Sequence, residues 1–152
     1  MLVQVSGRAG RGNRTGEVYV QTYAPFASSI QFARRSDVSG FIDEEMEMRK
    51  EFGYPPFTHL IRHLFRSRSS AKVEFYATEW TKQLQRAEIE NFRFKGPALA
   101  PLEKIKGYYR YHFFYFTPSV KRTIETLGKI RKNFPIDPEV HDILDVDAQQ
   151  IC

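Results

Sequence analysis

The chain has 152 residues, a formal net charge of +5, 41% hydrophobic and 27% charged residues, and one cysteine, Cys152. This balance excludes a disordered chain, an internal disulfide and a cysteine-based zinc site, and it predicts one ordinary domain or a small domain with an appended arm. The positive charge favours an anionic partner, nucleic acid first, and no apolar run approaches the ~18 residues of a transmembrane helix, so we expect no membrane segment.

The N-terminal stretch, residues 4–11, reads Gln-Val-Ser-Gly-Arg-Ala-Gly-Arg and holds two arginines, each directly after a glycine. If this stretch is helical, Gln4, Arg8 and Arg11 lie on one face. The planar guanidinium group binds phosphate in a bidentate fashion, and the small residues between the arginines let a ligand approach. The pattern therefore predicts a phosphate contact. A solvated, glycine-rich end without a role is the alternative.

A β-prone run and two helices are predicted between residues 12 and 56. The run at 17–23 follows a turn rich in helix breakers and has the residue types of a short strand. Helices are expected at 27–35 and 38–52, with Gly53 as the C-cap of the second and two prolines, Pro55 and Pro56, preventing its continuation. The acidic residues near the start of the second helix point in different directions, so we expect a solvated face there rather than a metal site.

Residues 57–147 contain six predicted elements in the order β-α-β-β-α-β. They are a strand at 58–66, a helix from Ser69 or Ser70 to about Ala87, a short strand at 91–96, a strand at 108–116, a helix capped by Thr117 that ends near Asn133, and a strand at 139–146, with a loop at 97–107. Apolar residues recur at helical spacing in both helices. The order predicts an α+β, ferredoxin-like unit, in which a four-stranded antiparallel sheet carries two helices on one face.

The strand at 108–116 is the most aromatic part of the chain. One of its faces must pack on the helices, and the other could stack unpaired bases, at about 1–3 kcal/mol per base. Core packing of most of these rings is the alternative. Arg110 between Tyr109 and Tyr111 is the leading candidate for a nucleic-acid contact. The basic residues that could follow phosphate groups are Lys104, Lys106, Lys121 and Arg122. A solvated helix face explains the last two equally well.

Several short motifs, taken in order, are similar to those of one known family. The N-terminal Gln-x-x-Gly-Arg-x-Gly-Arg pattern resembles the last motif of the second RecA-like lobe in superfamily 2 helicases. The motifs that follow are Gly53-Tyr54-Pro55-Pro56-Phe57, Gly96-Pro97-Ala98, Tyr108-Tyr109-Arg110-Tyr111, Pro118-Ser119 and Asp145-Val146-Asp147. Together they resemble, over nearly the whole chain, the C-terminal part of the primosomal protein N′ (PriA) family of bacterial replication-restart DNA helicases.

The resemblance implies a cytoplasmic, ATP-dependent 3′→5′ DNA helicase that recognises stalled forks and assembles the primosome. Residues 1–56 would be the end of the second helicase lobe with its connecting helices, and residues 57–152 a C-terminal ferredoxin-like domain. By the same resemblance Arg11 is the arginine finger on the γ-phosphate of ATP, with Gln4 and Arg8 beside it at the nucleotide. The parent enzyme would bind ATP and magnesium. The implied partners are forked or single-stranded DNA, single-strand-binding protein and other primosome proteins.

The family's phosphate-binding loop, DEAH-type motif and zinc-binding cysteines do not occur in this sequence. We therefore expect a fragment that begins inside the second helicase lobe, binds no ATP, magnesium or zinc by itself, and is inactive alone. The four histidines have no spacing that predicts a metal site. The alternative is a free-standing ferredoxin-like module that binds nucleic acid or docks a protein, for which the N-terminal arginine motif would serve no purpose.

Overall fold

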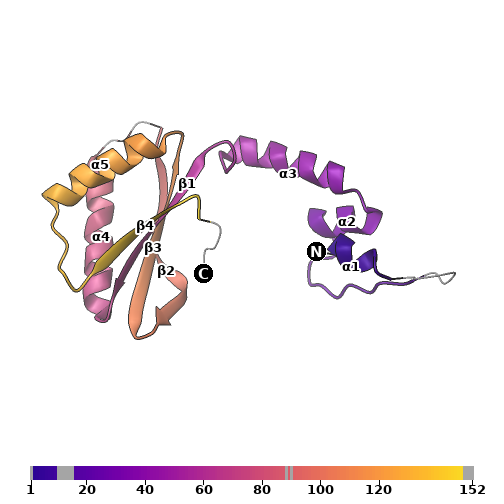
Figure 1. Cartoon of the computed structure of the whole chain (residues 1–152), viewed down its shortest axis with the longest axis horizontal. Helices are drawn as coiled ribbons and strands as arrows, with labels where there is room; N and C mark the ends of the chain where they lie inside the picture. Colours follow the sequence, from indigo (N-terminus) through magenta and orange to yellow (C-terminus); the bar gives the residue numbers. More distant parts are fainter. Residues whose placement is uncertain (1, 10–15, 88, 90, 149–152) are drawn as a thin grey trace. The chain divides into compact units, whose positions relative to one another are not determined.

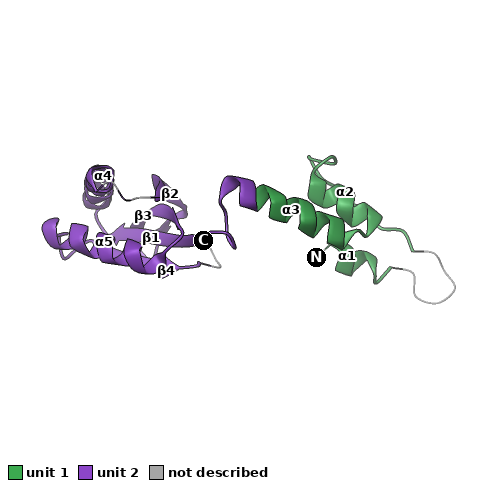
Figure 2. Ribbon diagram, turned by 90° about the horizontal axis from the view of Figure 1, so that it is seen from above, with its two compact units in different colours: residues 1–49 green, residues 50–152 purple. Residues whose placement is uncertain are grey.

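The computed structural model describes residues 2–9, 16–87, 89 and 91–148. The chain divides into an N-terminal unit, residues 1–49, and a C-terminal unit, residues 50–152 (Figure 2). The boundary lies inside helix α3, Val38–Phe52, whose last three residues belong to the C-terminal unit. The functional division that the sequence suggests, 1–56 and 57–152, stays a prediction.

The N-terminal unit consists of helices with little buried surface. Helix α1 is Leu2–Ser6, α2 is Ser28–Arg35, and most of α3 follows (Figure 1). Asp37 caps α3, because its carboxylate accepts a hydrogen bond from the Gly40 amide at 2.9 Å. None of the described residues in these helices is buried, so they form no hydrophobic core of their own.

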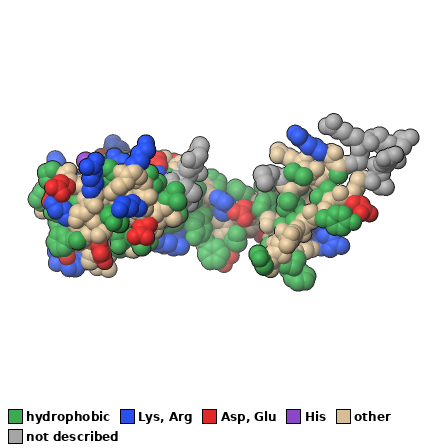
Figure 3. Space-filling model, turned by 90° about the horizontal axis from the view of Figure 1, so that it is seen from below, with side chains coloured by type: hydrophobic (Ala, Val, Ile, Leu, Met, Phe, Trp, Pro, Cys, Tyr) green, Lys and Arg blue, Asp and Glu red, His purple; other side chains and the backbone are tan. Residues whose placement is uncertain are grey.

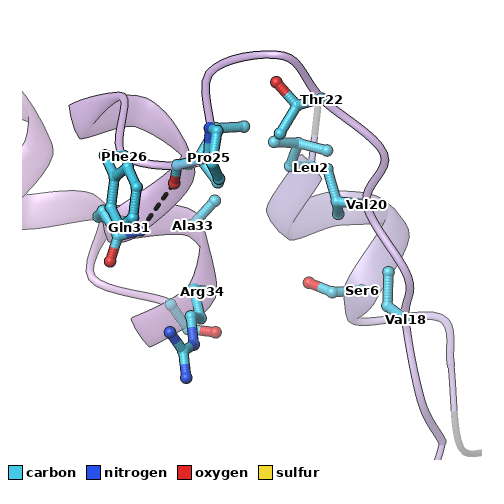
Figure 4. Close-up of a pocket in the computed structure, with 12 residues that line it drawn as sticks. Leu2, Ser6, Val18, Val20, Thr22, Pro25, Phe26, Gln31, Ala33 and Arg34 are labelled. Atoms are coloured by element: carbon cyan, nitrogen blue, oxygen red, sulfur yellow. Dashed lines mark hydrogen bonds between the residues drawn. The ribbon is translucent and has the colours of Figure 1, made fainter.

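The β-prone run at 17–23 is not a strand in the structure, and that prediction is wrong. Residues 17–22 have no regular secondary structure. A strand needs a neighbour that pairs its backbone groups, and the described part of the N-terminal unit contains no other strand. Val18 and Val20 instead line, together with Leu2 and Phe26, an open hollow of about 480 Å³ (Figure 4).

The C-terminal unit is an antiparallel sheet with helices α4 and α5 packed on one face (Figure 1). Its elements are β1 His59–Ser67, α4 Ser70–Arg86, β2 Arg93–Ile105, β3 Tyr108–Thr117, α5 Val120–Asn133 and β4 His141–Val146. The four strands lie in the order β2-β3-β1-β4, and every neighbouring pair is antiparallel. This topology confirms the predicted α+β, ferredoxin-like unit.

The core lies between the sheet and the two helices and is rich in aromatic rings. Alternation along β1 and β3 turns Ile61, Phe65, Phe113 and Tyr115 toward the helices, where Trp80 of α4 meets them. The full cluster is Ile61, Phe65, Val73, Ala77, Trp80, Leu84, Phe113, Tyr115, Leu127, Ile130, Ile136 and Val140. We call this side of the sheet the inner face and the side turned away from α4 and α5 the outer face.

A buried polar chain crosses this core. Trp80 Nε1 donates a hydrogen bond to the Tyr115 hydroxyl at 2.9 Å, and we assign the hydroxyl as the donor to His63 Nδ1 at 2.8 Å. His63 Nε2 lies 3.4 Å from a carboxylate oxygen of Asp142. Burial lowers the pKa of His63, and the contact with His63 lowers the pKa of Asp142. His63 is therefore a neutral structural residue at pH 7.

Three local predictions around β3 are wrong. Residues 97–105 are not a loop but continue β2, and Lys106 and Gly107 form a tight turn with φ of 50° and 85°, the left-handed values that two-residue hairpins use. The N-cap of α5 is Ser119, which accepts a hydrogen bond from the Arg122 amide, whereas Thr117 is the last residue of β3. The helical spacing of apolar residues in α5 predicts a buried Ile124, but Ile124 is 41% exposed and Thr123 is buried instead.

Candidate nucleic-acid interface

The predicted contact residues of the C-terminal unit lie at two ends of its sheet. At the hairpin end, β1 finishes, β4 begins and the Lys106-Gly107 turn joins β2 to β3. At the far end, β3 finishes at Thr117 and α5 begins. The ten residues of β3 separate the ends by roughly 33 Å, at about 3.3 Å per residue. The predicted residues therefore form two separate groups rather than one patch.

Lys104, Lys106 and Tyr109 gather at the hairpin end. Lys104 Nζ lies 3.2 Å from the Tyr109 hydroxyl and 4.4 Å from the centre of its ring, a cation–π contact. Lys106 is exposed at the tip of the hairpin. Both lysines are exposed and neither forms an ion pair among the described residues. A lysine over an aromatic ring, with a second exposed lysine at the tip of the same hairpin, suits a phosphate group with its adjoining base.

Arg110 does not share a face with Tyr109 and Tyr111. Alternation along β3 places the two tyrosines beside the core on the inner face, where both are half-buried and where burial raises the pKa of Tyr111. Arg110 lies on the outer face, is only 7% exposed, and donates from Nη1 to the carbonyl of Leu102 at 3.1 Å. Its guanidinium group holds the irregular part of β2, residues 100–103, against the sheet.

Lys121 and Arg122 lie in the first turn of α5, at the far end, and both are exposed. Arg122, but not Lys121, lines a hollow of about 350 Å³. Thr117, Ser119, Thr126 and Lys129 also line it, together with one acidic residue, Glu125. The Ser119 hydroxyl is already engaged as the helix cap, so the exposed cations are the groups left for an anionic partner.

Sequence analysis missed a second cationic and aromatic group at the far end. The guanidinium carbon of Arg93 lies 4.8 Å from the centre of the Phe116 ring, and Lys95 Nζ lies 5.9 Å from it. Tyr54 packs edge-on against the same ring with 5.3 Å between centres. Arg93 also donates to the Phe52 carbonyl at 2.7 Å, which ties the end of α3 to β2. In the sequence, Arg93 and Lys95 alternate with Phe92 and Phe94, and this alternation could have indicated the group.

The N-terminal motif is described only in part. Gln4 is exposed on α1, and Arg8 is exposed in the turn that follows, where its amide donates to the Val5 carbonyl at 3.1 Å. Arg11, the predicted finger, lies outside the described residues. Two exposed polar side chains one turn apart fit a contact to a phosphate, although they provide no cradle around one.

The described residues contain neither a candidate metal site nor a membrane-spanning helix. No three histidine, cysteine, aspartate or glutamate side chains there are placed so that they could hold a metal ion. In the same part of the chain, no helix is both long and apolar enough to cross a membrane.

Comparison with known proteins places this arrangement in a family. The model of the family described as primosomal protein N C-terminal domain matches residues 50–148. The chain is 34% identical over 137 residues to a Thermotoga maritima protein and 32% identical over 150 residues to a Synechocystis protein, both named Replication restart protein PriA. It covers 90% and 99% of its own length in these matches, but only 18% of each relative. The resemblance is confirmed, and the chain belongs to the primosomal protein N C-terminal domain family.

Proposed function

We propose that the chain is the C-terminal part of an ATP-dependent DNA helicase that acts in replication restart, and that its C-terminal unit contacts DNA. The observation that carries the proposal is the family match over residues 50–148, which covers the whole ferredoxin-like fold. Exposed lysines and arginines beside aromatic rings at both ends of the sheet support it. In this proposal the helicase recognises stalled replication forks and acts in the cytoplasm of a bacterium.

The ATP-binding part of this proposal concerns the N-terminal unit. Gln4, Arg8 and Arg11 would contact the nucleotide, with Arg11 placed against charge that develops on the γ-phosphate. ATP with magnesium supplies the phosphoryl group whose transfer drives unwinding in such enzymes. This sequence contains no Gly-x-x-x-x-Gly-Lys-[Ser/Thr] loop that could cradle the phosphates. The chain alone is therefore expected to bind DNA without hydrolysing ATP.

The proposed partners are single-strand-binding protein and other primosome proteins. The exposed cations at the far end, Lys121 and Arg122, suit either a DNA backbone or an acidic protein segment. The two partners can occupy different ends of the sheet, because roughly 33 Å separates the ends.

Fluorescence anisotropy of the whole chain with labelled forked, single-stranded and duplex oligonucleotides tests the proposal. We expect salt-sensitive binding that weakens when Lys104 and Lys106 are both changed to glutamine. Changing Lys121 and Arg122 to glutamine is the matched pair, because it removes the same charge from the far end. Absence of binding to all three DNA forms at low salt would contradict a DNA-binding role. Sustained, DNA-stimulated ATP hydrolysis by the chain would contradict the assignment of catalysis to other parts of the helicase.

The second candidate is a free-standing module that binds nucleic acid or docks a protein. The observation in its favour is that the C-terminal unit has a complete hydrophobic core of its own, whereas the described helices of the N-terminal unit have no buried residue. The length of the open reading frame separates the two candidates. Several hundred upstream codons that include a phosphate-binding loop support the helicase.

A further inference from the structure

An unpaired cluster of cations occupies the outer face at the hairpin end. Arg66 of β1 is the direct cross-strand neighbour of Arg110 on β3 and of His141 on β4. Three side chains able to carry positive charge therefore stand side by side on three adjacent strands. Directly opposite residues have Cβ atoms about 4.5–5.5 Å apart, and like charges in this position destabilise a sheet. An anion bound between them would relieve this repulsion.

The cluster surrounds one aromatic ring. The guanidinium carbons of Arg66 and Arg68 lie 5.3 and 5.5 Å from the centre of the Tyr108 ring, and the His141 ring lies 6.1 Å from it. Arg66, Arg68 and His141 are exposed and Tyr108 is half-buried. Figure 3, which views the molecule from below, shows several lysine and arginine side chains exposed on the C-terminal unit.

No carboxylate neutralises these cations within the described part of the chain. The nearby ion pairs use other groups: Arg62 pairs with Asp145 at 3.0 Å, and Lys72 pairs with Asp137 at 2.9 Å. Neither Arg66 nor Arg68 has an ion pair in that part of the chain, although both have long side chains that could reach one. Two exposed arginines that lie next to each other and have no acidic partner can bind a phosphate group.

We propose that Arg66, Arg68, Tyr108 and His141 form a binding subsite for single-stranded nucleic acid. The two guanidinium groups hold a backbone phosphate, and the adjoining base stacks beside Tyr108. A base can reach such a ring only when it is unpaired, which favours a single strand over a duplex. This subsite lies on the outer face, whereas Lys104 and Tyr109 lie at the inner side of the same end. The proposal rests on the nucleic-acid-binding function above and names the form of nucleic acid that this surface takes.

The test is a set of titrations of the whole chain with a labelled oligothymidylate of about 16 nucleotides, the upper range of a single-domain site. Arg66→Gln and Arg68→Gln should each weaken binding about three- to tenfold at low salt and reduce the salt slope by about 0.7 per charge removed. Arg86→Gln is the matched control, since it removes the same charge from an exposed position at the end of α4 and should change neither quantity.

Variants of Tyr108 distinguish the contribution of base stacking to binding from that of charge. Tyr108→Leu should weaken single-strand binding about tenfold with the salt slope unchanged, as for loss of one stacked base. Tyr108→Phe keeps the ring and should retain binding within about twofold. Circular dichroism and thermal unfolding of each variant show whether its fold is intact.

The outcomes are distinguishable. If the wild-type chain binds the oligonucleotide but Arg66, Arg68 and Tyr108 variants bind equally well, the subsite is wrong and the general DNA-binding function stands. If the wild-type chain binds no DNA at low salt, both fail. An acidic peptide of equal charge serves as a competitor. Arginine-dependent peptide binding without oligonucleotide binding would show a protein-docking surface and overturn the proposal.

Discussion

Arg110 is a predicted nucleic-acid contact, and in the structure its guanidinium group also holds part of the protein's own backbone. It lies on the sheet face opposite Tyr109 and Tyr111, and only 7% of its surface is exposed, so its contact with nucleic acid stays a prediction. Its hydrogen bond to the Leu102 carbonyl fixes residues 100–103 of β2. Its charge adds to the positive potential around Arg66, its cross-strand neighbour.

Arg110→Ala should lower the free energy of unfolding by about 1.5–3 kcal/mol, the usual effect of losing a hydrogen bond to a charged group. Amide hydrogen exchange at residues 100–103 should become faster. Arg122→Ala is the exposed control and should change stability by no more than about 0.5 kcal/mol. Unchanged stability of Arg110→Ala, combined with weaker DNA binding, would restore its predicted contact role.

His63 makes the stability of the C-terminal unit sensitive to acid. Its folded-state pKa is lowered by burial, so below its ordinary value of about 6.5 the unfolded chain binds more protons than the folded one. Stability is therefore fully present above pH ~6.5 and falls as the pH drops from there toward the folded pKa. The lowered pKa of Asp142 adds a further loss only at lower pH, below about 4.

Urea unfolding between pH 7 and 5 checks this. Burial also lowers the pKa of His112, so the wild-type free energy of unfolding should fall with a slope of up to about 1.4 kcal/mol per pH unit for each of these two histidines. His63→Phe with Tyr115→Phe should reduce the slope by the share that His63 contributes. A wild-type slope equal to that of the double variant would show that His63 is not the titrating group.

At the scale of elements, the sequence predicts what local periodicity controls. Helix α3 has the predicted bounds, and Ser69, one of the two predicted starts, caps α4. The order of strands and helices follows from hydrophobic period and capping. The length of β2 could not be predicted, because Pro97 and Pro101 break its pattern and only pairing with β3 keeps it extended. The prediction of a strand at 17–23 fails for the opposite reason, since this run has strand-forming residues but no partner strand in the described part of the chain.

Gly96 is the glycine on which β2 depends. Its φ is +116°, and a Cβ placed there would lie 2.6 Å from the His112 carbonyl oxygen on β3. Gly96→Ala should therefore destabilise the C-terminal unit by about 2–3 kcal/mol. Gly128→Ala in α5 is the matched change, with no atom within 4 Å of the new methyl group apart from the adjoining backbone of its own helix, and should stabilise by about 0.5–1 kcal/mol. Thermal unfolding of the two variants should show shifts of opposite sign, and a gain for Gly96→Ala would refute the close strand packing.

The candidate site is predictable only in part, because strand pairing brings together residues that are distant in the sequence. Lys104, Lys106 and Tyr109 are close in sequence, so their grouping at the hairpin end could be anticipated. Arg66, Arg68, Tyr108 and His141 come from three strands, and only the cross-strand register brings them together. Lys121 and Arg122 are also among the predicted phosphate contacts, but β3 carries the chain from the hairpin to the opposite end of the sheet, where they lie.

At the scale of the whole molecule, the two units differ in how they can hold themselves together. The C-terminal unit buries an aromatic core, and the family match begins where this unit begins, at residue 50. The described N-terminal helices bury no residue, and Val18 and Val20 line an open hollow. We therefore expect the N-terminal unit to be the less stable of the two.

Limited proteolysis measures this difference. The first cuts should fall before about residue 55 and leave a resistant fragment that contains the whole C-terminal unit, because backbone in a packed core is cleaved only after opening. Mass spectrometry identifies the fragment ends. Early cuts within residues 70–130 would contradict an independently stable C-terminal unit.

The central claim is that the C-terminal unit binds nucleic acid, and amide chemical-shift mapping tests it most directly. Isotope-labelled whole chain is titrated with unlabelled single-stranded oligonucleotide at low salt. The account predicts salt-reversible shifts that are largest at the hairpin end, around Arg66, Arg68, Lys106 and Tyr108, with α4 unchanged. Spectra that stay unchanged at excess oligonucleotide, or that change only within residues 2–49, would contradict it.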